Sequence, residues 1–273
     1  MNPDENEDLI HASSSFATHI IKVRGFKVVV RHLPHEVKYM EAVLQLLEKQ
    51  KNSQNWETRY VLVLWLSILV LIPFHLSRFD SHEKGDTSED SKAKTLMQRI
   101  LKAIQINLAF GDKSQDAVAF LSAKFLTRPE IVQKFWPEFL DWALQVISQE
   151  SSDRMHDLKK IGAMKAVCAI YKHGKREDLL KHASTVLKII QDSKLNEDTN
   201  VVIQKLAVKL MQRLGLTFLK AKVASWRYQR GSRSLALNLD TSKVEAKKEE
   251  EIEEDEDYDV PDEIEEVIGN VLL

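Results

Sequence analysis

The residues that could build a covalent active site are few in this sequence. Its 273 residues include one Cys, nine His and eight Gly. A nucleophilic Ser, Cys or Thr needs a base and a third group that orients the base, and no candidate stands in a glycine-rich turn. Cys168 lies between Val167 and Ala169 on an apolar helical face, which is typical of a small buried hydrophobic residue. We therefore predict no nucleophilic site.

The spacing of the His, Cys and Gly residues also supports neither a metal site nor a nucleotide site. No His pair has the four-residue spacing with an intervening Glu that zinc hydrolases use, and one Cys cannot complete a structural zinc site. Neither a Walker-type phosphate loop nor a dinucleotide-binding glycine pattern occurs. The sequence predicts a protein that is not an enzyme and binds neither metal nor cofactor.

The strongest chemical signal is an acid-free basic stretch. Between Thr199 and Leu239 there is no Asp or Glu, whereas eight Lys and Arg residues occur there. At about 100° per residue, three of these cations follow one edge of an apolar stripe formed by Val202, Leu206, Leu210 and Leu214. The residues that we assign to a partner-binding surface are Lys205, Lys209, Arg213, Lys220, Lys222, Trp226, Arg227, Arg230 and Arg233.

Three interpretations of this basic stretch remain open on the residues alone. The cations could neutralise the acidic segment that follows, they could track a nucleic-acid backbone, or they could bind an acidic protein. A Trp flanked by Arg side chains favours a protein interface, because these residues dominate binding hot spots. The acidic segment would compete with a nucleic acid for the same surface.

That acidic segment, residues 245–266, contains 14 acids and two Lys, a net charge of −12. Such a composition buries too little apolar surface to offset the entropy of ordering. We expect residues 240–260 to be disordered, either as a spacer or as a mimic of an acidic partner. Residues 261–273 predict the start of a further helix whose apolar stripe has no later partner in the chain, as in a fragment or short isoform.

The elements that position these residues are predicted to be helices. Apolar residues recur at helical spacing in about ten segments before the acidic tail, with few turn residues between them. The predicted helices span residues 9–23, 37–50, 56–72, 96–110, 114–125, a segment from Pro129 or Pro137 to 147, 159–171, 177–191, 201–214 and 216–226. Pro34 is expected in the first turn of the helix at 37–50. Gly174 is expected as a left-handed helix cap, and Gly215 is expected to end the helix at 201–214. Residues 80–92 are expected to form a mobile loop.

The order of these helices predicts an all-α, HEAT/armadillo-like solenoid of helical hairpins over residues 1–239. A closed but irregular α-domain is the alternative, because no strict sequence period is present. The apolar run at residues 60–72 is too short for a membrane span, which needs about 20 residues. The single Cys favours a reducing compartment and the acidic N-terminus is not a secretory signal, so we expect a cytoplasmic protein.

Long strings in the sequence also resemble a known family. They are IKVRGFK at 21–27, PHEV at 34–37, WETRY at 56–60, LWLS at 64–67, LIPF at 71–74, FLDW at 139–142, KHGKRED at 172–178, RLGLTFLK at 213–220 and WRYQRG at 226–231. In order and spacing they resemble the N-terminal part of the tubulin-folding cofactor D family, the tubulin-specific chaperones D.

The resemblance implies a cytoplasmic, cytoskeleton-associated chaperone built from HEAT or armadillo repeats. Family members capture β-tubulin, act with tubulin-folding cofactors E and C to assemble and disassemble the αβ heterodimer, and promote GTP hydrolysis on tubulin, which makes them GTPase activators. They also associate with an Arf-like small GTPase. Tubulin is acidic, so we expect it to be the protein that docks on the basic stretch. A nucleic-acid-binding or generic adaptor module of helical repeats is the alternative.

Overall fold

The computed structural model describes residues 3–50, 55–79, 95–149 and 153–219. The chain divides into two compact units, Met1–Leu214 and Gly215–Leu273. The arrangement given below is that of the first unit.

Within the described residues the structure contains ten α-helices, three short 3-10 helices and no strand. The α-helices are α1 (Pro3–Arg24), α2 (Phe26–Val29), α3 (Tyr39–Lys49), α4 (Trp56–Leu69), α5 (Leu96–Asn107), α6 (Ser114–Leu126), α7 (Pro129–Ser148), α8 (Arg154–His173), α9 (Arg176–Asp192) and α10 (Val201–Phe218). The 3-10 helices are η1 (Val30–His32), η3 (Leu76–Phe79) and η4 (Leu195–Glu197). The expected all-α class is confirmed.

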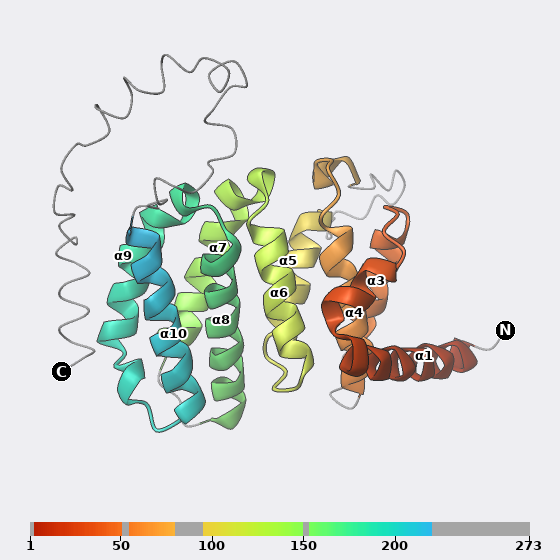
Figure 1. Ribbon diagram of the computed structural model, residues 1–273, viewed down its shortest axis with the longest axis horizontal. Coiled ribbons are helices and arrows are strands. Elements are labelled where there is room, and N and C mark those ends of the chain that lie inside the picture. The colour runs from red at the N-terminus through yellow and green to blue at the C-terminus, as the bar shows by residue number, and fades with distance from the viewer. Residues whose placement is uncertain (1–2, 51–54, 80–94, 150–152, 220–273) are drawn as a thin grey trace, which may run out of the picture. The chain divides into compact units, whose positions relative to one another are not determined.

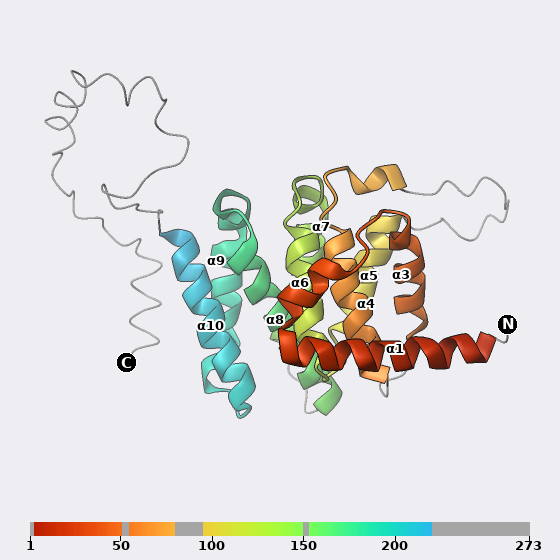
Figure 2. The ribbon, with the colours of Figure 1, turned by 45° about the vertical axis from the view of Figure 1, so that its right-hand side comes forward.

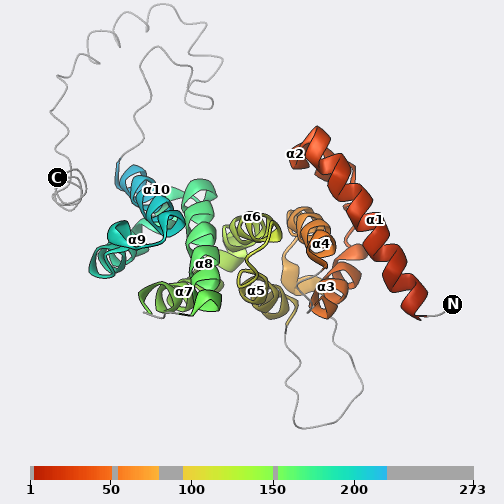
Figure 3. The same cartoon turned by 90° about the horizontal axis from the view of Figure 1, so that it is seen from below.

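The helices of the first unit form two rows of paired elements (Figure 1). In one row α4 packs on α6 and α6 packs on α8, and these are the most extensive contacts between elements. In the other row α3 contacts α5 and α7 contacts α9, while α3, α5 and α7 each pair with the next helix along the chain. Viewed along the helices, the two rows are separate (Figure 3). Helix α1 lies against the outer side of α4 (Figure 2).

Local sequence signals explain where several helices begin. Thr95 caps α5 in a capping box, in which its hydroxyl accepts from the Gln98 backbone and the Gln98 side chain accepts from Thr95. Pro129 occupies the first position of α7, where its missing N–H costs nothing. The Asp153 carboxylate accepts from the N–H of Met155 at the start of α8. The starts of these three helices therefore follow from residues that can be recognised in the sequence.

Close packing between α6 and α8 depends on one glutamine and one glycine. The Gln115 side chain donates to the carbonyl oxygens of Leu108 and Leu158 at 2.9 and 2.8 Å, which links the end of α5 to the start of α8. A Cβ added at Gly162 would lie 2.1 Å from the Leu108 oxygen. The absence of a side chain at Gly162 lets α8 approach this carbonyl.

The apolar run predicted as a buried helix is α4. Nine of its residues are buried, and the Trp65 indole donates to the Pro34 carbonyl oxygen at 2.5 Å. Within the described part of the chain, no helix has both the length and the apolar character that a bilayer span requires.

Of the two starts left open for the helix expected to end at residue 147, the structure shows Pro129, and α7 runs through Pro137. Two other predicted helix boundaries and one predicted helix-end conformation are wrong. Pro34 precedes α3 by five residues and is not in its first turn. Gly174 ends α8 in an extended conformation with φ −75°, because α9 begins two residues later and the chain must turn at once. Gly215 does not end a helix, since α10 continues to Phe218.

Several expectations fall on residues outside those the structure describes. They are the loop at 80–92, the acidic segment at 240–260, the helix at 261–273 and the part of the predicted helix 216–226 beyond Leu219.

Candidate partner-binding surface

The start of α10 is anchored by polar contacts to the preceding turn and to α8. The Asn200 side-chain oxygen accepts from the Val202 N–H at 3.0 Å, and the Asp198 carboxylate accepts from the Asn200 N–H at 2.8 Å. The Lys160 ammonium of α8 lies 3.8 Å from the same Asp198 carboxylate. These contacts fix the rotation of α10 and thereby decide which of its side chains face outward.

The inward face of α10 is apolar, as the sequence pattern predicts, with one exception. Leu206, Leu210 and Leu214 are buried, together with Ile203 and Ala207. Val202 was expected in this stripe but is 46% exposed. It lies in the first turn of α10, and its prediction as part of the buried stripe is wrong.

Lys205, Lys209 and Arg213 follow one line along α10, four residues apart. Lys205 and Lys209 are exposed and Arg213 is half-buried. The Cys168 thiol of α8 lies 3.8 Å from the Leu206 carbonyl oxygen of α10. Burial raises the pKa of this thiol to about 12, while the positive charges of Lys209 and Arg213 act in the opposite direction. The two cations are therefore close enough to α8 to act on its electrostatics.

Helices other than α10 contribute further cations to the same region. His173, at the end of α8, has a lowered pKa, first because of burial and then because of the positive charges of Lys124, Lys172, Lys27 and Arg213. These four residues belong to α6, α8, α2 and α10. We call Lys27, Lys124, Lys172 and Arg213, gathered around His173, the basic cluster.

Aromatic rings lie among these cations. The rings of Phe120 and His173 meet edge to face with centroids 6.2 Å apart, and Phe26 meets Phe120 in the same way at 5.5 Å. The Lys124 ammonium lies 5.3 Å from the centroid of the Phe120 ring. A Lys ammonium over an aromatic ring is held there by cation–π attraction. Of the residue types that dominate protein-binding hot spots, this region contributes Arg213.

Lys27, Lys124, Lys172 and His173 share no signal in the sequence that predicts their proximity, because they are up to 146 positions apart in the chain. A local signal did exist for two of them, since Lys172 and His173 occupy the last turn of α8. Cations there interact favourably with the negative end of the helix dipole. Interaction with the helix dipole explains why a cation occupies position 172. It does not explain why cations from four helices converge.

Six of the assigned residues lie outside the described part of the chain: Lys220, Lys222, Trp226, Arg227, Arg230 and Arg233. Their assignment to the surface stays a prediction. The described residues place Lys205, Lys209 and Arg213 on one helix, and bring only Arg213 into the basic cluster.

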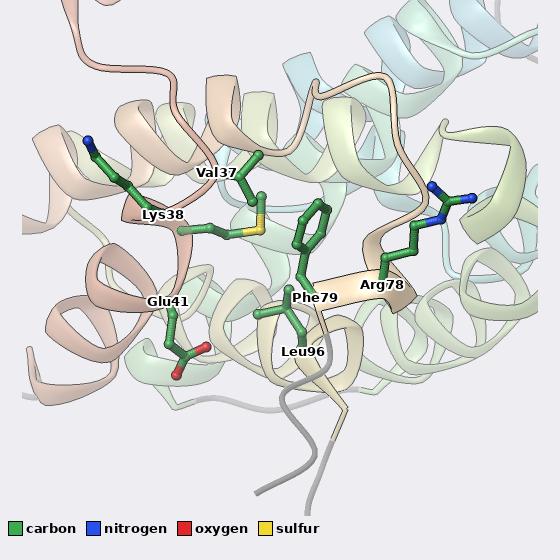
Figure 4. Close-up of a pocket in the computed structure, with 7 residues that line it drawn as sticks. Val37, Lys38, Glu41, Arg78, Phe79 and Leu96 are labelled. Atoms are coloured by element: carbon green, nitrogen blue, oxygen red, sulfur yellow. The ribbon is translucent and has the colours of Figure 1, made fainter.

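An open pocket of about 280 Å³ lies elsewhere, between the start of α3, η3 and the start of α5. The side chains of Val37, Phe79 and Leu96 converge in it, while the charged ends of Lys38 and Arg78 point away (Figure 4). Lys38 forms an ion pair with Glu36 at 2.5 Å. The charges at its rim are thus directed outward, and the pocket is a weaker candidate than the basic cluster.

Across the described residues no group of three or more His, Cys, Asp or Glu side chains is placed to hold a metal ion. The structure does show cations and aromatic rings on a helical framework, and this arrangement is suited to binding an anionic surface.

Comparison with known proteins agrees with the resemblance of the sequence strings. A family model described as "Tubulin-specific chaperone D-like, ARM repeat" matches residues 1–147, which is more than half of the chain. The chain belongs to this family. A second model of the same family, described as "Tubulin-specific chaperone D-like, ARM repeats", matches residues 202–273 and so includes nearly all of α10.

Two curated relatives illustrate the extent of the match. The tubulin-specific chaperone D of Dictyostelium discoideum is 30% identical over 213 residues, which are 70% of this chain and 14% of the relative. The tubulin-folding cofactor D of Schizosaccharomyces pombe is 24% identical over 212 residues, which are 76% of this chain and 17% of the relative. The chain thus spans about a sixth of the length of these family members. No solved structure matches significantly.

Proposed function

We propose that this chain is a binding scaffold that captures β-tubulin and assists assembly and disassembly of the αβ-tubulin heterodimer. The observation that supports the proposal is the basic cluster, in which positive charges from four helices act on His173. The His173 ring meets Phe120 edge to face, and the Lys124 ammonium lies 5.3 Å from the Phe120 centroid. Tubulin is acidic, and complementary charge accelerates association and selects partners. Lys205 and Lys209 extend this cationic surface along α10.

The proposed function consists of binding tubulin and includes no chemical step carried out by this chain. In the tubulin-folding reaction GTP is hydrolysed on tubulin, so a chaperone contributes by holding tubulin and needs no catalytic residue of its own. The chain would promote this hydrolysis only together with cofactors C and E. Association with these cofactors and with an Arf-like small GTPase, and a cytoplasmic location near the cytoskeleton, belong to the same proposal through the family relationship.

Three exposed cations allow a direct test without disturbing the core. The variant Lys27→Glu/Lys172→Glu/Lys209→Glu reverses one charge on each of α2, α8 and α10. We expect capture of β-tubulin released from chaperonin to weaken at least about tenfold at 0.1 M salt, and the salt dependence of capture to become shallower. Purified αβ-tubulin is assayed in parallel.

A matched control carries the same change in net charge elsewhere. The variant Lys49→Glu/Lys102→Glu/Lys188→Glu reverses three exposed cations of α3, α5 and α9. Equal losses in both variants would show that only net charge matters and would refute the assignment of the surface. Binding of unrelated RNA or DNA in a gel shift, with no capture of tubulin, would replace the proposal by the nucleic-acid alternative.

A further inference from the structure

Helix α1 packs with a side inward that mixes polar and apolar residues. Its buried positions include Ser14 and Thr18, at 6% and 1% exposure, besides Ile21. The His11 ring on the same side lies 2.7 Å from the Thr58 hydroxyl and accepts from the Asn55 amide at 2.9 Å. These specific polar contacts fix α1 on α4 in this orientation.

The opposite side of α1 is an exposed apolar stripe. Leu9, Phe16, Ile20 and Val23 are 62, 70, 39 and 84% exposed, and Ala12 between them is also exposed. Helices on a protein surface normally turn such a stripe toward the core. A contiguous exposed apolar patch of this kind marks an interaction site.

The spacing of residues in the stripe is symmetric along the helix. Positions 9, 12, 16, 20 and 23 are separated by three, four, four and three residues, so the pattern is symmetric about Phe16. In an isologous contact residue i meets residue j and residue j meets residue i. Two α1 helices paired antiparallel with Phe16 at the two-fold axis would therefore match Leu9 with Val23 and Ala12 with Ile20.

The charges at the two ends of the stripe fit the same register. Asp8 precedes its first residue and Arg24 follows its last, and both are exposed. Antiparallel pairing places Asp8 of each copy opposite Arg24 of the other. Glu7, beside Asp8, adds to an acidic N-terminal end, whereas Lys22 adds to a basic C-terminal end. An anionic membrane would instead favour cations along the whole helix.

We infer that α1 is a self-association surface, through which two copies of this chain pair antiparallel about Phe16. A pair of 22-residue helices, each about 33 Å long, is a smaller contact than the roughly 1,600 Å² of a standard interface. The dimer is accordingly weak, with a dissociation constant of micromolar order. This inference does not depend on tubulin binding.

Sedimentation equilibrium of the full chain over a concentration series tests the association. We expect a monomer–dimer equilibrium, which Phe16→Glu weakens at least about 100-fold because two carboxylates then meet at the two-fold axis. The control Met155→Glu, at a 58% exposed position of α8, leaves the dissociation constant unchanged. The inference would be overturned if the chain is monomeric at every concentration. Binding of such a monomeric chain to anionic vesicles would indicate a membrane as the partner of α1 instead.

Charge exchange tests the register. Asp8→Arg and Arg24→Asp are each expected to weaken the dimer several-fold, up to about tenfold, because each variant places like charges opposite each other at both ends. The double variant Asp8→Arg/Arg24→Asp restores complementary pairs and is expected to restore dimerisation. Failure of the double variant to recover would refute the antiparallel arrangement.

Cross-linking tests the symmetry directly, because the one native thiol, Cys168, is buried. Phe16→Cys is expected to form a disulfide-linked dimer under mild oxidation. Leu9→Cys alone is not expected to form this disulfide. In the antiparallel pair, position 9 of one copy lies 14 residues along the helix from position 9 of the other, which is about 21 Å. A disulfide requires Cα atoms within roughly 7 Å of each other. A mixture of Leu9→Cys and Val23→Cys chains should link. Equal self-linking of all three single variants would indicate a parallel or nonspecific contact.

Discussion

Replacing Arg59 by Met should destabilise the fold substantially, because Arg59 is the one fully buried cation in the described part of the chain. It is 0% exposed and lies on α4. Its guanidinium forms an ion pair with Asp112, before α6, and stacks 4.3 Å from the centroid of the Phe110 ring. The variant keeps an unbranched side chain about as long as the aliphatic part of arginine, and leaves the Asp112 carboxylate without this counterion.

The magnitude follows from the burial of the two partners. Removing one member of a buried pair costs about 3–5 kcal/mol. Because the Asp112 side chain keeps 23% of its exposure and still accepts from the Ser114 N–H at 2.8 Å, we expect the lower end, about 3 kcal/mol of unfolding free energy. For a chain of this size that corresponds to a decrease of about 6–12 °C in Tm.

The assay is chemical unfolding followed by circular dichroism, with Asp112→Asn and the double variant completing a cycle. We expect the double variant to cost at least about 1 kcal/mol less than the sum of the single variants, because their effects share one contact. Arg154→Met, at an exposed position of α8, serves as the control and should change stability by less than about 0.5 kcal/mol. A loss below about 1 kcal/mol for Arg59→Met, or strict additivity in the cycle, would contradict the reasoning.

Two further predictions concern glycines and the thiol. Gly162→Ala should destabilise the protein by about 2 kcal/mol or more in the same unfolding assay, because the added Cβ would collide with the Leu108 carbonyl. At Gly215 an added Cβ meets nothing within 4 Å, so Gly215→Ala should stabilise α10 by about 0.8–1 kcal/mol. A change of the same sign in unfolding free energy for both variants would show that packing does not distinguish the two sites. Cys168 is buried, and its pKa is raised to about 12. It should therefore resist alkylation by iodoacetamide at pH 8 in the native chain and react fully in denaturant. Rapid labelling of the native chain would disprove the burial.

The sequence predicts most of the fold because the helices are strongly periodic and their starts are marked by local chemistry. The helix expected at 96–110 is α5, and the one expected at 177–191 is α9. Two of the errors concern glycines: Gly174 ends α8 but is not left-handed, and Gly215 does not end α10. Glycine is compatible with several backbone conformations, and only the path of the following chain decides among them.

The candidate surface was predictable only in part. Periodicity along one helix places Lys205, Lys209 and Arg213 on a line, because residues four apart share a face of a helix. The same reasoning cannot bring Lys27 and Lys124 to His173, since this proximity depends on how four helices pack.

From the sequence alone follow the all-helical class, the family and the excess of positive charge in residues 199–239, because composition, periodicity and long matching strings are properties of the chain itself. Tertiary structure decided which faces are covered. It holds the side of α1 that carries His11 against α4 through the His11–Thr58 contact, and leaves the apolar stripe around Phe16 outward. The physical reason is that an amphipathic pattern states which residues share a face, whereas the partner of that face is set by contacts between segments distant in sequence.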